Sequence, residues 1–177
     1  MEIEGRRSKI ICGVDLAVRR RSSIALLEGE EITVIDVEGV EKILEECRGA
    51  QIVAVDSPLS HSSGHRQVDR EMMRAGYRVL PPSWMRGLVD RAILIAEGLR
   101  TVETHPTSSM RNLGLSPVKP KDHLDSVLCA LAGLAVILGI AQEIRASDGV
   151  IYLVPKSFPY LPKPLGSTLR WRLERRS

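Results

Sequence analysis

The sequence is poor in cysteine and carries almost no excess charge of either sign. It has three cysteines, Cys12, Cys47 and Cys129, among 177 residues. It contains 25 Lys and Arg residues and 22 Asp and Glu residues. An odd number of widely spaced cysteines, two of them inside apolar runs, predicts buried thiols in a reducing compartment and argues against a disulfide framework or a zinc site. The net charge of +3 gives no global basic field that would indicate nucleic acid.

The sequence also lacks a membrane segment and the glycine-rich loops of nucleotide-binding proteins. The longest apolar run, Val127 to Ala141, is shorter than the roughly 18 residues of a membrane span, and we interpret it as a buried core helix. The start, MEIEGRRSK, is too acidic for a secretory signal, so we expect a cytoplasmic protein without a membrane partner. Neither GxGxxG nor GxxxxGK[ST] occurs, which argues against an ATPase or kinase-like domain.

The length of the chain suits one domain with a substantial core. We predict a domain over residues 1–155, followed by a loosely packed tail over residues 156–177 that is rich in proline and arginine. The end of this tail, LRWRLERRS, places one aromatic residue among charges, a pattern used for stacking on bases but more typical of disorder.

The pattern of apolar residues predicts an α/β fold with a five-stranded mixed sheet. The expected strands cover residues 9–17, 23–28, 31–37, 51–56 and 99–103, with a short final strand within 148–155. Helices are expected over 40–47, 66–75, 84–97 and 122–145, with Trp84 packing a helix start against the core. The first and fourth strands are nearly continuous in apolar residues, as central parallel strands are. We therefore expect the strand order 3-2-1-4-5, with helices on both faces.

Acidic residues stand where an apolar environment makes them costly. Asp15 ends the run IICGVDLA, Asp56 ends the run IVAVDSPL, and Asp122 and Asp125 open the long apolar helix. A buried carboxylate is unfavourable unless it is paired or binds a metal. Neighbouring strands lie about 4.8 Å apart and helix residues three apart share a face, so these acids can converge on one site. An all-oxygen site suits Mg²⁺ or Mn²⁺, and two such ions about 3.5 to 4 Å apart can hydrolyse a phosphodiester.

Six segments together resemble the domain-of-unknown-function family 429, a set of predicted nucleases with a ribonuclease H-like fold. They are GVDLA at 13–17, VAVDSPLS at 53–60, HRQVDREMMRAG at 65–76, ETHP at 103–106, KDHLDSVLCALAG at 121–133 and DGVIYLVP at 148–155. Resolvase-type members of the wider superfamily place one carboxylate on strand one, one on strand four and a pair on a helix. Asp15, Asp56, Asp122 and Asp125 match that pattern. His123 stands where relatives often have a second acid, which leaves open which helix residue binds the metal.

Each acid also has a structural alternative. Asp56 precedes Ser57 and Pro58 and could serve as a turn former. Asp122 and Asp125 could stabilise the start of the helix through capping and the helix dipole. A structural role for Asp15 requires an arginine or a backbone partner that the sequence does not reveal.

Three further residues are candidates for the site. Glu103 ends the fifth strand and is either another metal ligand, a substrate contact or a solvent-facing strand end. His105 and His123 could assist proton transfer or contact substrate, because histidine titrates near neutral pH, or they are ordinary surface and hydrogen-bonding residues.

Four arginines are candidate phosphate contacts. Arg66 and Arg70 are four apart on one expected helix face, which suits two phosphates as well as it suits a solvated ion-pair surface. Arg19 and Arg20 follow the first strand at the sheet end of Asp15, where they either contact the nucleic-acid backbone or form a soluble loop.

The sequence therefore predicts a metal-dependent nuclease that uses Mg²⁺ or Mn²⁺ and acts on RNA or DNA. A non-catalytic ribonuclease H-like protein that binds nucleic acid or a protein partner is the main alternative, and a nucleotide-phosphate-binding ATPase or kinase-like domain is a weaker one. The substrate and the oligomeric state, a homodimer included, stay open.

Overall fold

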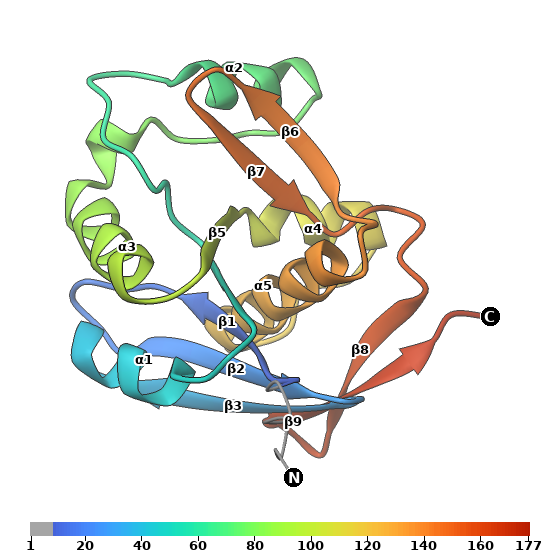
Figure 1. Ribbon diagram of the computed structural model, residues 1–177. Coiled ribbons are helices and arrows are strands. Elements are labelled where there is room, and N and C mark those ends of the chain that lie inside the picture. The colour runs from blue at the N-terminus through green and yellow to red at the C-terminus, as the bar shows by residue number, and fades with distance from the viewer. Residues whose placement is uncertain (1–8) are drawn as a thin grey trace, which may run out of the picture.

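The computed structural model describes residues 9–177, which form an α/β fold around one nine-stranded mixed sheet (Figure 1). The sheet order is β6-β7-β5-β4-β1-β2-β3-β9-β8. The N-terminal residues whose acidity argued against a secretory signal lie almost wholly outside the described part of the chain. The strands are β1 (Ile11–Asp15), β2 (Ser22–Glu28), β3 (Glu31–Val37), β4 (Ile52–Val55), β5 (Thr101–Thr104), β6 (Gln142–Ala146), β7 (Gly149–Leu153), β8 (Tyr160–Leu165) and β9 (Ser167–Arg175).

The centre of the sheet has the predicted order, but the predicted number of five strands is wrong. Strands β3-β2-β1-β4-β5 lie side by side as expected, while β7 and β6 extend one edge and β9 and β8 extend the other. Strand β6 falls inside the helix predicted to reach residue 145. That helix instead ends at Ile137, and Gly139 follows with a φ of 72°, a left-handed conformation that favours glycine and ends helices.

Strands β1 and β4 form the buried parallel pair that the sequence predicts. Every residue of both strands is buried, and Val14 pairs with Val55 in parallel register. The backbone N–H of Asp56 donates to Val14 O over 3.0 Å, which continues the pairing one residue beyond β4. Asp15 and Asp56 therefore leave the sheet at the same edge.

Helices pack on both faces of the sheet. They are α1 (Gly39–Cys47), α2 (Gln67–Arg74), α3 (Arg86–Gly98), α4 (Pro106–Leu113) and α5 (Lys121–Ile137), with a 3₁₀ turn η1 (Pro82–Trp84). Ile11 and Ile52 pack against α5, whereas Cys12, Val14 and Val53 pack in a second cluster with α1 and α3. Because side chains alternate along a strand, Asp15 shares the face of Ile11, which is the face that α5 covers.

Gly13 on β1 lets α5 lie directly on the sheet. A Cβ atom at this position would stand 2.9 Å from Ala130 Cα and closer still to the backbone oxygen of Ser126 and the backbone nitrogen of Ala130. Only glycine fits beneath the helix at this distance. The close approach brings the first turns of α5, with Asp125, toward the end of β1.

The C-terminal residues are part of the sheet, so the prediction of a loosely packed tail is wrong. Strands β8 and β9 form a hairpin, and Ile32 of β3 pairs with Trp171 of β9. Trp171 is 2% exposed and belongs to the main core, so it cannot stack on bases. Trp171 and Leu173 are the buried positions of an alternating strand pattern, which the proline and arginine content of this segment obscured.

The prediction of three free thiols is also wrong for two of the cysteines. Cys12 on β1 and Cys47 at the end of α1 form a disulfide, and only Cys129 of the described residues is a free, buried thiol. The cysteines therefore do not argue for a reducing compartment. Within residues 9–177, no helix is long and apolar enough to cross a lipid bilayer.

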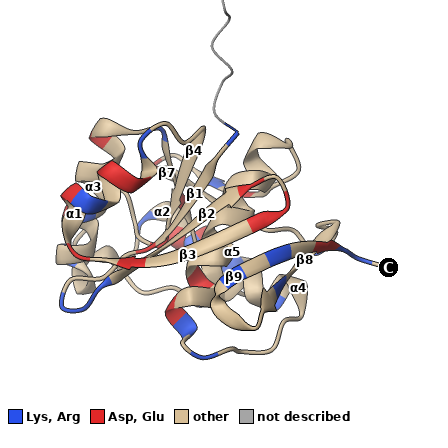
Figure 2. Cartoon of the chain, turned by 90° about the horizontal axis from the view of Figure 1, so that it is seen from below, with Lys and Arg blue, Asp and Glu red and all other residues tan. Residues whose placement is uncertain are grey.

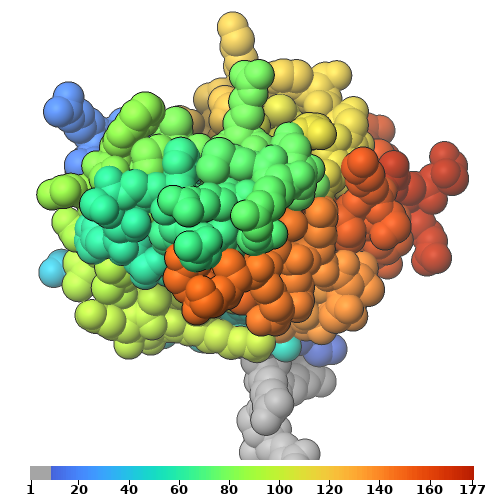
Figure 3. All heavy atoms as spheres, turned by 90° about the horizontal axis from the view of Figure 1, so that it is seen from above, coloured from blue at the N-terminus to red at the C-terminus, as the bar shows by residue number. Residues whose placement is uncertain are grey.

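The segments after β4 lie over the same end of the molecule as the β6–β7 hairpin. Helix α2 packs on β6 and β7, and Figure 3 shows the green residues around α2 beside the orange strands. Asp148, in the turn between β6 and β7, accepts hydrogen bonds from the backbone N–H groups of Gln67 and Val68 at 2.7 and 3.0 Å. These contacts fix the start of α2 at the β6–β7 turn, beside the amino end of β7.

Candidate metal centre

Three acidic side chains meet at the carboxyl end of the central strands. Asp15 ends β1, Asp56 follows β4, and Asp125 lies in the second turn of α5. Each offers a carboxylate oxygen, and the three oxygens lie within 4.8 Å of one another. The structure thus brings together three of the four aspartates that the sequence singled out.

All three carboxyl groups of this cluster have pKa values above that of an ordinary aspartate. Burial, followed by the negative charges of Asp56 and Asp125, raises the pKa of Asp15 to about 8. Burial, followed by the charge of Asp125, raises the pKa of Asp56 to about 7. Burial also raises the pKa of Asp125, although its contact with Lys121 opposes this effect. Such a cluster needs protons or a cation to remain buried.

Asp125 has one oxygen that lacks a partner. Its Oδ2 accepts a hydrogen bond from Lys121 Nζ at 2.7 Å, while its Oδ1 is buried without a hydrogen bond, the only such side-chain atom in residues 9–177. An unsatisfied buried oxygen is costly. A divalent cation held by the three aspartates would satisfy it, so the donor set fits Mg²⁺ or Mn²⁺.

Asp122 lies at the rim and not in the cluster. Its side chain is 36% exposed and pairs with Arg20 Nη1 at 3.0 Å. It is not the helix N-cap, because Pro120 occupies that position and no side chain caps the helix. Of Asp122 and Asp125 on α5, it is therefore Asp125 whose carboxylate lies with those of Asp15 and Asp56.

Two basic side chains border the cluster. Arg20 Nη2 lies 3.5 Å from Asp15 Oδ2 while it also holds Asp122, and half of the Arg20 side chain is exposed. Lys121 contacts Asp125 and is 60% exposed in its side chain. Arg20 supplies the partner that a structural role for Asp15 requires, although it leaves the Asp15 pKa raised. Sequence reasoning missed Lys121, whose only signal is its position four residues before Asp125 on the helix.

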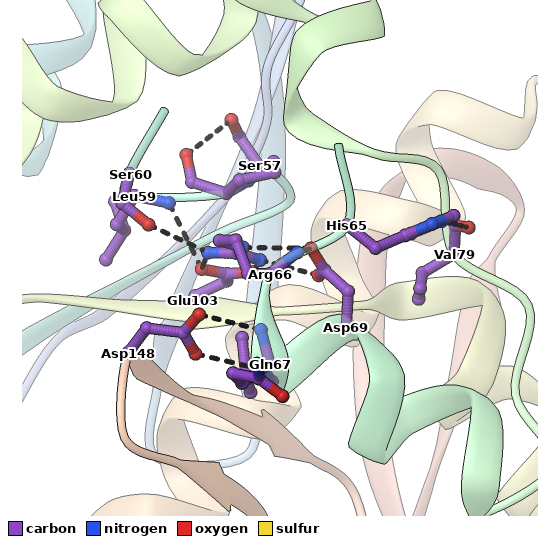
Figure 4. Close-up of polar contacts among 12 residues, drawn as sticks. Ser57, Leu59, Ser60, His65, Arg66, Gln67, Asp69, Val79, Glu103 and Asp148 are labelled. Atoms are coloured by element: carbon purple, nitrogen blue, oxygen red, sulfur yellow. Dashed lines mark hydrogen bonds and ion pairs between the residues drawn. The ribbon is translucent and has the colours of Figure 1, made fainter. Parts of the chain in front are cut away.

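Glu103 and Arg66 bind each other and are not the metal ligand and phosphate contact that the sequence suggested. Arg66 donates to Glu103 Oε1 and Oε2 at 2.8 and 2.6 Å and to both carboxylate oxygens of Asp69 (Figure 4). The backbone N–H of Leu59 adds a bond to Glu103 Oε1. All three side chains are buried, so Arg66 has no free donor face for a phosphate. Arg70 is exposed on α2 and does not form a two-arginine grip with Arg66.

The two candidate histidines have different environments. His105 follows β5, its Nδ1 lies 2.6 Å from Ser108 Oγ, and burial, followed by the charge of Lys121, lowers its pKa to about 4. It is therefore neutral at pH 7. His123 lies away from the acidic cluster, with Nδ1 at 2.7 Å from Thr168 Oγ1 and Nε2 at 3.0 Å from Asp36 Oδ2. These contacts tie α5 to β3 and β9, which is a structural role.

The remaining basic candidates do not build a single charged face. Arg19 is exposed in the loop after β1. Figure 2 shows basic and acidic stretches interspersed along the chain, in agreement with the small net charge. The two basic side chains that contact the acidic residues at this site are Arg20 and Lys121.

Comparisons with known proteins leave the family of this chain unassigned. No protein-family model matches the chain, and the searches of curated proteins and of solved structures found no match. The resemblance to the domain-of-unknown-function family 429 stays a prediction from the six segments, and the carboxylate cluster itself is the basis for assigning a function.

Proposed function

We propose that this protein is a metal-dependent nuclease that hydrolyses phosphodiester bonds of RNA or DNA on a ribonuclease H-like sheet. The observation that carries the proposal is the convergence of Asp15, Asp56 and Asp125, whose oxygens lie within 4.8 Å of one another. The partnerless Oδ1 of Asp125 supports a cation at this point. A structural cluster of acids would be expected to satisfy that oxygen within the protein.

The roles of the residues follow from their positions. Asp15, Asp56 and Asp125 would hold Mg²⁺ or Mn²⁺ through oxygen ligands. A pair of such ions, when bound, activates water and stabilises the leaving oxygen of a phosphodiester. Arg20 and Lys121 border the cluster with exposed side chains and would attract and orient the phosphate. Asp122 would hold Arg20 in that position.

Cleavage assays test the proposal. Purified protein is incubated with labelled single-stranded, duplex, hybrid and branched substrates in Mg²⁺, in Mn²⁺ or in a chelator. We expect metal-dependent cleavage of at least one substrate, and a loss of about a hundredfold or more in Asp56→Asn, since a metal ligand matters at least as much as its supporting residues. Glu143→Gln, an exposed acid on β6, is the matched control and should retain activity.

The main alternative gives a different outcome. A non-catalytic protein would bind nucleic acid or a protein partner without cleavage, and Asp56→Asn would leave that binding unchanged. Cleavage that persists in the chelator or in Asp56→Asn would contradict the proposed site.

A further inference from the structure

A pocket lies directly beside the carboxylate cluster. It has a volume of about 200 Å³, is lined on one side by Asp56, and sits at the carboxyl ends of β4 and β5, with Ile151 of β7 also in its lining. Pockets for drug-sized ligands hold roughly 300 to 1,000 Å³, so this one suits a single ring system. Ligands commonly bind at this edge of parallel sheets.

One wall of the pocket is apolar. Val79, Leu80 and Met85 come from the segment between α2 and α3, and Ile151 comes from β7. Leu80 is 53% exposed, which places an apolar side chain at the solvent side of the pocket. A flat, uncharged ring would remove this apolar surface from water.

The charged residues of the pocket argue against a phosphate inside it. Arg66 is held by Glu103 and Asp69 through the four hydrogen bonds drawn in Figure 4. One cation shared by two acids leaves this part of the wall with net negative charge and without a free donor. A phosphate would be repelled here, while Arg20 and Lys121 attract one at the neighbouring cluster.

The polar groups that remain suit a neutral ring with hydrogen-bonding atoms. The hydroxyls of Ser57 and Thr104 already donate to the carbonyls of Pro58 and Tyr152. His105 lines the pocket, and within residues 9–177 no hydrogen bond reaches its Nε2. A single histidine nitrogen can orient a base but distinguishes bases weakly.

Trp84 provides a second surface for a base. The sequence predicted that Trp84 packs against the core, which is wrong, because it is 74% exposed. Turn η1 presents it between the pocket residues Leu80 and Met85 in the chain. An exposed tryptophan whose neighbour in the chain lines the pocket is available to stack on a nucleic-acid base outside it.

We propose that this pocket holds one unpaired nucleobase next to the reacting phosphate, while Trp84 stacks on the adjacent base, so that the substrate is single-stranded nucleic acid. The assignment of a reacting phosphate rests on the proposed nuclease function. A paired base cannot enter, because it would first have to leave its duplex. The pocket accepts different bases, since stacking and one histidine nitrogen provide the recognition.

Binding of adenosine 5′-monophosphate tests the pocket without cleavage, because this probe has no phosphodiester bond. Trp84 is the exposed one of two tryptophans and Trp171 is buried, so quenching of tryptophan fluorescence reports on Trp84. Titration calorimetry gives the affinity, and ribose 5-phosphate serves as the ligand without a base. We expect quenching by adenosine 5′-monophosphate, and at least tenfold weaker binding of ribose 5-phosphate.

Variants at three exposed residues, Leu80, Trp84 and Leu94, complete the test. Leu80→Glu should weaken the binding of adenosine 5′-monophosphate about tenfold, as should Trp84→Ala, the effect of losing one apolar or stacking contact with a base. Leu94→Glu is the matched control, since Leu94 is 50% exposed on α3 and does not line this pocket, and it should leave binding unchanged.

The two proposals fail in different ways. Equal affinity for adenosine 5′-monophosphate and ribose 5-phosphate, or unchanged binding in both Leu80→Glu and Trp84→Ala, overturns the base pocket even if the protein cleaves nucleic acid. Binding of adenosine 5′-monophosphate that persists in a protein without affinity for Mg²⁺ overturns the nuclease and supports the pocket. A nuclease that cuts a duplex faster than a single strand of the same sequence contradicts the proposed substrate.

Discussion

Arg66 has a different role in the folded protein from the one that its sequence position suggests, because it is buried and not on the surface. It is 5% exposed and lies between Asp69 and Glu103, which are buried as well. The arginine offsets part of the negative charge of two acids that would otherwise destabilise the loop after β4. Its role is to support the pocket wall, and not to contact a phosphate.

Replacing this arginine should therefore destabilise the protein. Arg66→Met leaves two buried acids without their cation, and we expect the free energy of unfolding to fall by about 3 to 5 kcal/mol. Arg70→Met, at an exposed position on the same helix, should change it by less than about 0.5 kcal/mol. Urea unfolding followed by circular dichroism measures both, and equal small effects of the two variants would argue against a supporting role for Arg66.

The positions of Asp15 and Asp56 could be predicted from sequence because each ends a short, fully apolar strand. The partner of Glu103 could not be predicted, because Arg66 is 37 residues away in the sequence. Only the folding of the loop after β4 brings the two side chains together. Lys121 was missed for a similar reason. A lysine at a helix start is ordinary, and only the approach of α5 to β1 places it beside three acids.

Among the elements, α5 and β1 determine the geometry of the cluster. Asp15 and Asp56 are placed by hydrogen bonds within the sheet, but Asp125 is placed by how closely a helix packs on it. Gly13 sets that distance, because the backbone of α5 occupies the space where a side chain would be.

Gly13→Ala should therefore damage both stability and metal binding. The added methyl group meets backbone atoms that cannot rotate away, so we expect a loss at or above the upper end of the 1 to 3 kcal/mol typical of overpacking. Displacement of α5 should also weaken Mg²⁺ binding. Gly64→Ala is the matched control, because nothing lies within 4 Å of its added carbon. Thermal unfolding and calorimetry measure the effects, and wild-type Mg²⁺ affinity in a folded Gly13→Ala protein would show that helix approach does not set the site.

The central strand order could be predicted because β1 and β4 have the continuous apolar pattern of parallel neighbours. The edge strands could not be predicted as easily. Strand β6 alternates only between half-buried and exposed residues, and β8 contains two prolines, so neither has a strong strand pattern. The Cys12–Cys47 disulfide joins residues 35 apart, a spacing that carries no signal without the packing of α1 on β1.

For the molecule as a whole, the buried acids link stability to pH. The raised pKa values of Asp15 and Asp56 mean that the folded protein holds protons which the unfolded chain has released above pH 4. The free energy of unfolding then falls as the pH rises through about 7 and 8. His105 opposes this trend at lower pH, because its lowered pKa makes the unfolded chain bind the extra proton between about 4 and 6.5.

The metal-free protein should accordingly melt at a lower temperature at pH 8 than at pH 6.5, where the contribution of His105 has largely ended. Asp15→Asn should reduce this difference, because it removes the group with the pKa of about 8. Added Mg²⁺ should raise Tm more at pH 8 than at pH 6.5, since the ion competes with protons for the carboxylates. Scanning calorimetry with a chelator and with Mg²⁺ measures these changes, and a Tm that rises from pH 6.5 to 8 without metal would contradict the assignment.

Titration calorimetry with Mg²⁺ tests most directly whether three aspartates form a metal centre. The wild-type protein should bind Mg²⁺, and Asp125→Asn should lose about a hundredfold in affinity or all detectable binding, because it removes a ligand. Asp90→Asn, an exposed acid on α3, should bind as the wild type does. A wild-type protein without affinity for Mg²⁺ or Mn²⁺, or an Asp125→Asn protein with unchanged affinity, would contradict the metal centre.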